Sequence, residues 1–285
     1  MTAVEFVKYH GTGNDFLVVD ASAPVPDREA FAVAHCDRET GVEAGERRGA
    51  DGVLFLDLDV DADPARVEMT LVQPDGSIAE MCGNGARCVA SWAAERSGAT
   101  EFVVETPAGD RRAVVRDDGV QVEMGRPSFA PADVPLAREE PLVEESVEGL
   151  TVTAVNTGVP HAVAFVDDVD AVDLPAIAPA VRHADVFPEG ANVTLAEAVD
   201  AEEDDKGVRY RQRTFERGVE DETRACGTGA VAVLAAARRT GRTDGESAVV
   251  SPPGGDLRVT VPDDGSATLA GPTEREASGT LEVEP

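Results

Sequence analysis

The chain has 285 residues and a 42% hydrophobic composition, so it can bury a sizeable core, and its length favours roughly two domains. Its formal net charge of −30 argues against nucleic acids and anionic membranes as partners, because both repel an acidic protein. No apolar stretch approaches the roughly 18 residues of a membrane span. Residues 1–6 lack the basic and apolar regions of a signal peptide, so we expect a cytoplasmic protein.

Lysine occurs only at positions 8 and 206, and arginine supplies the other basic residues. An acidic, lysine-poor surface indicates adaptation to a cytoplasm of very high salt, where screening removes most self-repulsion. The four cysteines are too few for a disulfide scaffold, and the spacing of Cys82 and Cys88 is not that of a zinc site. We therefore predict no metal site, and we expect Cys36 and Cys88 to lie in the core.

The first half of the chain predicts short strands around one cysteine-containing, glycine-rich run. A helix is predicted at residues 27–36, capped by Asp27. The run Met81–Cys88 leads into a second, alanine-rich helix at 89–97, which Gly98 ends. The glycines at 11–13 precede a strand and not a helix, so we reject a dinucleotide site. Strands are predicted at residues 6–10, 16–20, 53–56, 66–72, 102–105, 112–116 and 120–124.

A stretch rich in proline and acidic residues, 126–140, separates the halves, and the same plan then starts again. A helix is predicted at 175–183, and the run Ala225–Ala230 leads into another at 231–240, which Gly241 ends. Gly13 precedes Cys82 by 69 positions and Gly158 precedes Cys226 by 68, which favours a duplicated unit over coincidence. Strands are predicted at 151–155, 162–166, 209–215, 257–261 and 267–270, with another entered through 190–194.

The two cysteines at equivalent positions suggest a paired use. A helix N-terminus presents backbone N–H groups and partial positive charge, which favour both a carboxylate and a thiolate. If Cys82 and Cys226 flank one carbon, a thiolate can remove a proton from one face while a thiol returns one to the other, which is racemisation or epimerisation. A disulfide redox switch and a non-catalytic amino-acid-binding module are the alternatives from other functional classes.

Short motifs extend through nearly the whole chain: His10–Phe16, Gly49–Gly52, Asp75–Ser77, Met81–Cys88, Gly158–His161, Phe187–Val193, Glu216–Val219, Ala225–Ala230, Pro253–Gly255 and Gly271–Pro272. Each is weak alone, but in this order they are specific, and they resemble those of the diaminopimelate epimerase family. The resemblance implies a cofactor-independent epimerase of lysine biosynthesis that interconverts LL- and meso-diaminopimelate, with Cys82 and Cys226 as acid and base. It also implies an α+β fold of two pseudo-symmetric domains, each a mostly antiparallel sheet around a central helix. We predict these domains at 1–125, completed by 274–285, and at 126–273.

The resemblance also implies roles for individual residues. His161 and Glu216 tune the protonation of the cysteines, and Arg217 suits a bidentate grip on the distal carboxylate of the substrate. Without the motifs, a turn histidine and a surface ion pair would be the simpler interpretations. The residues implied to bind substrate are Asn14, Gln73, Gly83, Asn84, Asn192, Glu216, Arg217, Gly227 and Thr228.

The sequence departs from the family pattern in several places. Gln73 and Val159 stand where asparagine is common, the segment Gly41–Arg48 looks inserted, and Glu220–Glu222 is one residue longer than usual. The nearest alternative is a proline racemase or hydroxyproline epimerase, but those enzymes usually have histidine where Asn84 stands. We allow for a homodimer.

Overall fold

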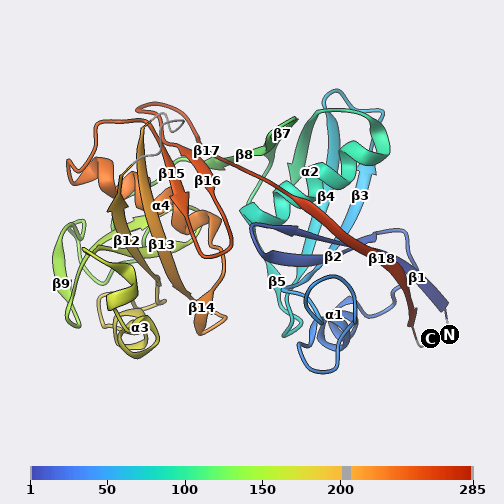
Figure 1. Ribbon diagram of the computed structural model, residues 1–285, viewed down its shortest axis with the longest axis horizontal. Helices are drawn as coiled ribbons and strands as arrows, with labels where there is room; N and C mark the ends of the chain where they lie inside the picture. The colour runs from blue at the N-terminus through green and yellow to red at the C-terminus, as the bar shows by residue number, and fades with distance from the viewer. Residues whose placement is uncertain (1, 201–206, 284–285) are drawn as a thin grey trace. The chain divides into compact units, whose positions relative to one another are not determined.

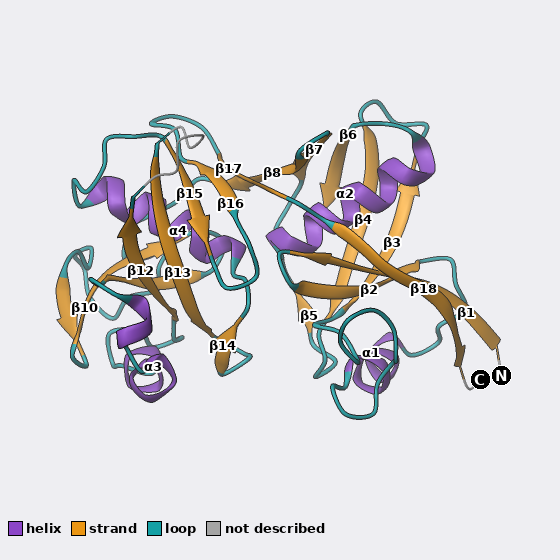
Figure 2. Cartoon of the chain, viewed as in Figure 1, coloured by secondary structure: helices purple, strands orange, loops and turns teal. Residues whose placement is uncertain are grey.

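The computed structural model describes residues 2–200 and 207–283, so Lys206 and the last two residues of the predicted segment 274–285 lie outside the described part. The chain divides into two compact units, Met1–Val122 with Gly271–Pro285, and Glu123–Ala270. Strands dominate both units, and each contains one long helix and one short α-helix (Figures 1 and 2). The predicted α+β class is confirmed.

In the first unit, the strands pair in the order β18-β1-β2-β3-β4-β6-β7-β8, with β5 also on β4. Only β2–β3 and β4–β6 are parallel among these pairs. The crossover between the first parallel pair contains α1 (Arg28–Cys36), and that between the second contains α2 (Gly83–Ser97). The strands are β1 (Thr2–Gly11), β2 (Asn14–Asp20), β3 (Val53–Asp59), β4 (Ala65–Val72), β5 (Ile78–Ala79), β6 (Glu101–Glu105), β7 (Arg111–Arg116), β8 (Gly119–Gly125) and β18 (Glu274–Val283).

The second unit repeats this plan. Its strands pair in the order β9-β10-β11-β12-β13-β15-β16-β17, with β14 also on β13, and its parallel pairs are β11–β12 and β13–β15. Here α3 (Leu174–Arg182) and α4 (Gly227–Arg239) lie in the two crossovers, and a short 3-10 helix covers Val169–Ala171. The strands are β9 (Glu145–Val147), β10 (Leu150–Asn156), β11 (Pro160–Phe165), β12 (Asn192–Val199), β13 (Val208–Glu216), β14 (Asp221–Thr223), β15 (Ser247–Ser251), β16 (Leu257–Thr260) and β17 (Ala267–Gly271).

The helices α2 and α4 form the centres of their units. α2 packs against β1, β2, β3, β4, β6 and β7, and α4 packs against the equivalent β10, β11, β12, β13, β15 and β16. Their buried faces are rich in glycine, alanine and valine, which allows strands to approach closely on several sides. Gly98 and Gly241 take positive φ angles of 72° and 70° at the helix ends, as predicted.

Both central helices begin earlier than the sequence predicts. They start at Gly83 and Gly227, and the preceding cysteine is the N-cap in each case. Glycine in a helix costs up to about 1 kcal/mol relative to alanine, which is why propensity places these starts later. At Gly229 a side chain has no room, since a Cβ there would lie 2.5 Å from Nε2 of Gln212.

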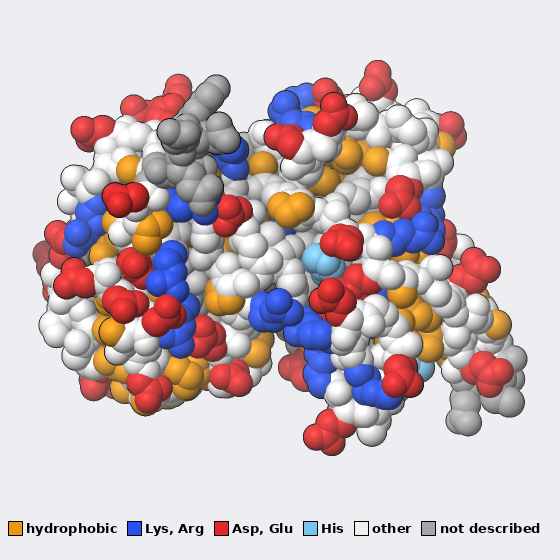
Figure 3. All heavy atoms as spheres, in the orientation of Figure 1, with side chains coloured by type: hydrophobic (Ala, Val, Ile, Leu, Met, Phe, Trp, Pro, Cys, Tyr) orange, Lys and Arg blue, Asp and Glu red, His pale blue; other side chains and the backbone are white. Residues whose placement is uncertain are grey.

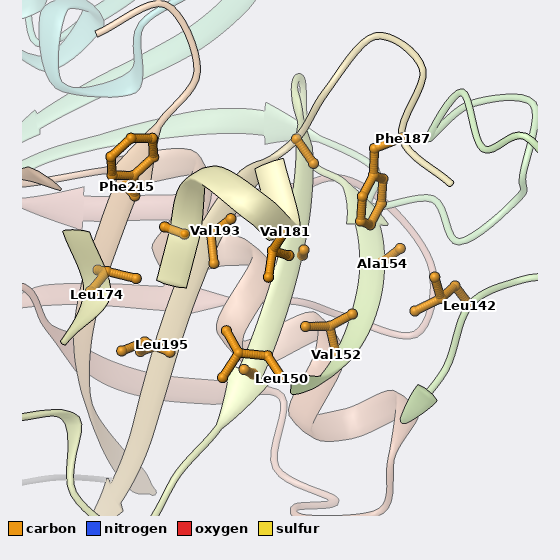
Figure 4. Packing of buried hydrophobic residues seen from close by; sticks show 14 of the residues in the cluster. Leu142, Leu150, Val152, Ala154, Leu174, Val181, Phe187, Val193, Leu195 and Phe215 are labelled. Atoms are coloured by element: carbon orange, nitrogen blue, oxygen red, sulfur yellow. The ribbon is translucent and has the colours of Figure 1, made fainter. Parts of the chain in front are cut away.

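A second apolar layer covers the outside of each sheet. In the first unit Phe31 and Cys36 of α1 pack with Leu17, Val53 and Phe55 of the strands. In the second unit α3 packs against the strands in the same way (Figure 4). The side chains labelled in this cluster are Leu142, Leu150, Val152, Ala154, Leu174, Val181, Phe187, Val193, Leu195 and Phe215. Each sheet therefore has apolar side chains on both faces, because the central helix packs on one face and the short helix on the other.

Five strands were not predicted from the sequence: β5, β9, β14, β15 and β18. β18 is largely exposed and lacks the alternation of apolar and polar residues by which a strand is recognised. Its position is fixed by antiparallel pairing with β1, which no local pattern reveals.

The segment Gly41–Arg48 is anchored by a buried lysine. Nζ of Lys8 donates to the carbonyl oxygens of Ala44, Arg47 and Gly49, at 3.0, 2.5 and 2.9 Å. It also lies 2.8 Å from a carboxylate oxygen of Asp15, and both side chains are almost fully buried. The compact ammonium group of lysine suits this cage, whereas a planar guanidinium is larger and differently shaped.

We expect Lys8→Met to be strongly destabilising. The substitution removes the donor of three carbonyl oxygens, of which that of Gly49 is buried, and one of the three cations around the buried carboxylate of Asp15. The loss of a donor to a buried polar group typically costs about 1–3 kcal/mol in the free energy of unfolding. Denaturant unfolding measures the loss. Arg112→Met is the matched control, because it removes an exposed ion pair with Glu101 that is worth at most about 1 kcal/mol. Equal losses in the two variants would contradict the anchoring role.

Candidate active-site residues

Cys82 caps the N-terminus of α2. Its backbone is extended, at φ −144° and ψ 112°, and its sulfur accepts a hydrogen bond from the N–H of Gly85 at 3.4 Å. The side chain is partly exposed, whereas Gly83 and Asn84 behind it are buried. A sulfur that accepts a backbone N–H bond at a positive helix end is in a setting that favours its thiolate form.

Asn14 connects Cys82 to a carboxylate. Its Oδ1 lies 3.8 Å from Sγ of Cys82 and accepts a hydrogen bond from Nδ2 of Asn84 at 3.3 Å. Its Nδ2 donates to Asp51 at 2.7 Å. Because an ionised carboxylate only accepts hydrogen bonds, Asp51 fixes which end of the Asn14 amide faces the sulfur.

The other end of this chain of hydrogen bonds is Arg87, on the second turn of α2. Its Nη1 donates to Oδ1 of Asn84 at 3.0 Å and its Nη2 donates to the hydroxyl of Thr12 at 3.1 Å. A guanidinium only donates, so Arg87 fixes the Asn84 amide as Asp51 fixes that of Asn14. The donors therefore all point one way, from Arg87 through Asn84 and Asn14 to Asp51.

Further cations hold Asp51 and its neighbour Asp15 in place. Arg38 donates to both carboxylates, and Arg47, from the segment Gly41–Arg48, lies 2.5 Å from Asp15 and 3.3 Å from Asp51. Burial opposes ionisation of Asp15, but the hydrogen bonds from Arg38 and Lys8 outweigh it and hold the pKa of Asp15 well below its usual range. Arg47 thus supports Asn14 through Asp51.

Cys226 occupies the equivalent N-cap of α4. Its backbone is extended, at φ −126° and ψ 103°, and its side chain is buried, with 5% exposed. Its Sγ lies 3.4 Å from the hydroxyl of Thr228. The same hydroxyl is 3.0 Å from Nε2 of His161, so a short polar path joins the cysteine to the histidine.

His161 is completely buried and its tautomer can be assigned from its neighbours. The backbone N–H of Arg217 donates to Oδ1 of Asn192 at 2.7 Å, which leaves Nδ2 of Asn192 to face Nε2 of His161 at 3.4 Å. Nε2 is therefore an acceptor, and the proton is on Nδ1, 3.1 Å from the hydroxyl of Thr194. Burial, with a smaller contribution from the charge of Arg217, lowers the pKa of His161 to about 3.

The remaining predicted site residues are placed as follows. Arg217 is partly exposed, and its Nη1 donates to the carbonyl of Glu189 at 3.3 Å. Glu216 accepts a hydrogen bond from Thr223 at the end of β13. Gln73 lies in the turn after β4, where its Nε2 donates to Ser77 at 2.7 Å, so the structure does not join it to Cys82.

The loop that carries Arg217 is held in place by Glu220 and Arg182. Glu220 has a positive φ of 57° and accepts hydrogen bonds from the N–H of Gly218 and from the guanidinium of Arg182, at 3.0 and 2.9 Å. Gly190 packs so closely on Arg182 that a Cβ there would lie 1.3 Å from Nη1. Arg182 therefore connects α3 to the loop of Arg217.

The repeat identifies residues that sequence reasoning quoted in motifs but did not assign to the site. Asp15 and Asp51 lie side by side on β2 and at the entrance to β3, as His161 and Asn192 do on β11 and β12. Asn84 and Thr228 are likewise equivalent, two residues after each cysteine. Aligning the halves at their cysteines pairs Asn84 with Thr228, whereas the other pairs follow from the register of the parallel strands. Arg87 has Val231 as its counterpart.

Neither a metal centre nor a membrane span is found in the described residues. Within 2–200 and 207–283, no group of three or more histidine, cysteine, aspartate or glutamate side chains is arranged to hold a metal ion. None of the described helices combines the length and apolar composition needed to cross a membrane.

Comparison with known proteins identifies the relatives of the chain. The family model for diaminopimelate epimerase matches residues 6–130 and 153–275. A diaminopimelate epimerase of Methanocella arvoryzae is 43% identical, with 100% of this chain and 99% of the relative covered. One of Methanothrix thermoacetophila is 44% identical, over 91% and 89%. A hydroxyproline epimerase structure from Agrobacterium vitis shares the fold with a TM-score of 0.64 and 19% identity, over 99% and 94%.

We expect His161 to make stability depend on pH. In acid the unfolded chain protonates this histidine near pH 6.5, whereas the folded chain does so only near pH 3. The folded state is therefore destabilised as pH falls through this interval, by up to about 1.4 kcal/mol per pH unit. In His161→Gln the free energy of unfolding, measured with denaturant between pH 3 and 6.5, should therefore depend less on pH than in the wild type.

The control for this measurement is His183→Gln, at an exposed position. It shows how much the loss of an exposed histidine changes the slope of stability against pH, for comparison with the loss of the buried one. Parallel curves for the wild type and His161→Gln would show that His161 is not held neutral in the folded protein.

Proposed function

Because the chain belongs to the diaminopimelate epimerase family, we propose that it interconverts LL- and meso-2,6-diaminopimelate by proton transfer through Cys82 and Cys226. The observation that carries the proposal is the repeated N-cap, in which each cysteine begins a buried helix at the same point of a duplicated unit. An epimerase must treat two faces of one carbon alike, and two equivalent thiols provide that.

The proton transfer needs one thiolate and one thiol. In one direction the thiolate of Cys82 takes the α-proton, so that a C–H bond breaks and an S–H bond forms. The electron pair is left on the α-carbon and delocalises into the α-carboxylate. Cys226 then gives its proton to the opposite face, which forms the new C–H bond and leaves a thiolate. The reverse direction exchanges the roles, and the protons and charges balance.

The α-carboxylate is assigned to the first turns of the central helices. The first-turn backbone N–H groups of Gly83 and Asn84, and those of Gly227 and Thr228, lie at positive helix ends. Negative charge grows on the carboxylate as the proton leaves, so fixed N–H donors stabilise the transition state more than the bound substrate.

His161 and Glu216 are assigned to the protonation of the cysteines. Nε2 of neutral His161 accepts from the Thr228 hydroxyl, which leaves the hydroxyl oxygen to accept from the thiol of Cys226. This arrangement gives the proton of the Cys226 thiol an acceptor. Glu216, hydrogen-bonded to Thr223, supplies a carboxylate next to Arg217.

The distal end of the substrate is assigned to Arg217, with Asn192 and Asn14 as neighbouring polar contacts. The planar guanidinium suits a carboxylate, and the Glu220–Arg182 clamp steadies the loop that carries it. Val159 has no polar side-chain group to offer. The Gln73 side chain is occupied by Ser77, so reaching the substrate requires that bond to open.

The setting that fits this activity is lysine biosynthesis in a cytoplasm rich in salt. Acidic side chains are scattered over the face seen in Figure 3, and the whole chain has 55 acidic against 25 basic residues. Such a charge is tolerated where ions screen the repulsion between carboxylates.

We expect Cys82→Ala and Cys226→Ala each to lower turnover of diaminopimelate at least about a hundredfold, because each removes one acid–base partner. The measurement is epimerisation of LL- or meso-diaminopimelate in deuterated water, with incorporation of deuterium at the α-carbon followed by mass spectrometry. Cys36→Ala and Cys88→Ala are matched controls, because both thiols are buried in the core and should affect stability alone. Near-normal turnover in either of the first two variants would refute the two-cysteine mechanism.

Substrate choice tests the assignment of Arg217. The unmodified protein should epimerise diaminopimelate and reject lysine and proline, which lack a second carboxylate. Arg217→Lys keeps the charge but loses the planar fork, so we expect kcat/KM for diaminopimelate to fall at least about tenfold. Equal turnover of proline and diaminopimelate would instead support a racemase of the proline type.

A further inference from the structure

We propose that Arg182 is a positioning residue that braces Arg217 through two turns of the chain and thereby makes the site selective for amino acids with a second, distal carboxylate. The inference deepens the proposed function, on which it rests for the role of Arg217. It assigns this selectivity to a residue of α3 that lies outside the sequence motifs.

The Arg217 side chain needs support from its surroundings. It is partly exposed and follows the end of β13, in a loop where Gly218 and Val219 are exposed. Its Nη1 donates to the carbonyl oxygen of Glu189 at 3.3 Å, which is long for a hydrogen bond. An arginine side chain has many rotamers, so a specific contact with a ligand requires that neighbouring groups fix its position beforehand.

The first of two turns that meet at Arg217 is formed by residues 187–190. The N–H of Gly190 donates to the carbonyl oxygen of Phe187 at 2.8 Å, which closes the turn. Within it, the carbonyl oxygen of Glu189 accepts the hydrogen bond from Arg217. The direction of that carbonyl group, and with it the place of the guanidinium, therefore depends on how this turn is held.

The second turn, residues 216–220, contains Arg217 itself. The N–H of Glu220 donates to the carbonyl oxygen of Glu216 at 2.8 Å, and the carboxylate of Glu220 folds back to accept from the N–H of Gly218 at 3.0 Å. Glu220 has a φ of 57°, in the left-handed region that residues other than glycine rarely adopt. Such a backbone conformation persists only where surrounding groups hold it.

Arg182 joins the two turns. Its Nε and Nη2 both donate to Oε1 of Glu220 in the second turn, at 3.2 and 2.9 Å. Its guanidinium also covers Gly190 in the first turn, so closely that a Cβ there would lie 1.3 Å from Nη1 and 2.6 Å from Cζ. The Arg182 side chain is 11% exposed and is thus packed between protein groups. One side chain therefore fixes both turns on which Arg217 depends.

The helix α3 gives Arg182 a rigid base. Arg182 is the last residue of α3, and Leu174, Ala178 and Val181 of the same helix lie in the apolar cluster on the outside of the sheet (Figure 4). A side chain on a helix held by the core is placed more precisely than one on a loop. The position of Arg217 is thus linked to the core of the second unit.

The first unit has an arginine at a corresponding place. Arg38 lies two residues after the end of α1, which occupies the same crossover as α3, and it donates to Asp15 and Asp51. Asp51 in turn accepts from the amide of Asn14 at 2.7 Å. In each unit an arginine at the end of the outer helix therefore braces residues of the proposed site, which supports the same role for Arg182.

Selectivity follows from how firmly the guanidinium is held. A distal carboxylate accepts two parallel hydrogen bonds from Arg217 only when the plane of the guanidinium has the right direction. This contact is made in the bound substrate and in the transition state alike. Loosening it should therefore raise KM and leave kcat nearly unchanged.

The first test examines the two turns without turnover. Exchange of backbone amide hydrogens is measured by mass spectrometry on peptides that contain residues 187–192 and 216–222. Arg182→Met should accelerate exchange in both peptides at least about tenfold, because loss of the side chain frees both turns. Unchanged exchange in the folded variant overturns the proposal.

Arg209→Met is the matched control for the exchange measurement. The Arg209 side chain is 13% exposed and pairs with Asp256, so its burial and its kind of partner resemble those of Arg182. It lies near the start of β13, at the opposite end of the strand from Arg217. This variant should leave exchange in both peptides as it is in the unmodified protein.

The second test measures KM and kcat for meso-diaminopimelate. We expect Arg182→Met to raise KM at least about tenfold with kcat within about twofold, and Arg182→Lys to raise KM less. In Arg217→Lys, which has already lost the planar fork, Arg182→Met should raise KM by a clearly smaller factor. An equal factor in the two backgrounds, or a fall in kcat without a rise in KM, overturns the positioning role.

If Arg182→Met does not fold, Glu220→Gln tests the same ion pair from its exposed side. It keeps an oxygen that can accept from Gly218 and removes the negative charge, so exchange and KM should rise by smaller factors. No rise in either quantity overturns the proposal. An unmodified protein that does not epimerise diaminopimelate contradicts the proposed function, whereas the exchange measurement still decides whether Arg182 holds the two turns.

Discussion

A helix that begins inside a protein leaves its first backbone N–H groups without helical partners, and this constraint governs both halves of the molecule. α2 and α4 are each packed against six strands, so their N-termini lie among other protein groups and not in bulk water. A cysteine caps each, and glycines in the first turn keep side chains away from the donors. The backbone N–H groups that could bind an anion are therefore a direct consequence of burying the start of each helix.

Fixed direction is the second property of the site. A chain of amides between a group that only donates and a group that only accepts has one arrangement of its hydrogen atoms. Arg87 and Asp51 impose such an arrangement on Asn84 and Asn14, and the N–H of Arg217 imposes one on Asn192 and His161. Side chains oriented in this way need little reorganisation when charge moves nearby.

The sequence predicted what local signals determine. Gly98 and Gly241 mark the ends of the central helices, and the recurrence of the cysteine run at nearly equal spacing indicates the repeat. It placed the helix starts too late, because glycine disfavours helix and the reason for its presence is a neighbour distant in sequence, Gln212 in the case of Gly229. β18 was missed for the same kind of reason, since pairing with β1 defines it. The sequence does not distinguish Arg87 and Asp51 from the other residues of their motifs, because their contacts with Asn84 and Asn14 are seen only in the structure.

The buried ion cluster around Lys8 and the acidic surface divide the electrostatics of this chain into two parts that respond to different variables. Mobile ions reach the exposed carboxylates but not the fully buried ammonium group of Lys8 or the carboxylate of Asp15, which is 2% exposed. Lowering the salt concentration therefore increases the repulsion between exposed carboxylates, whereas it leaves the electrostatic field of the buried charges near Cys82 unchanged. Ionic strength therefore acts on the exposed carboxylates, whereas the interaction of Lys8 with Asp15 depends on the residues packed around it.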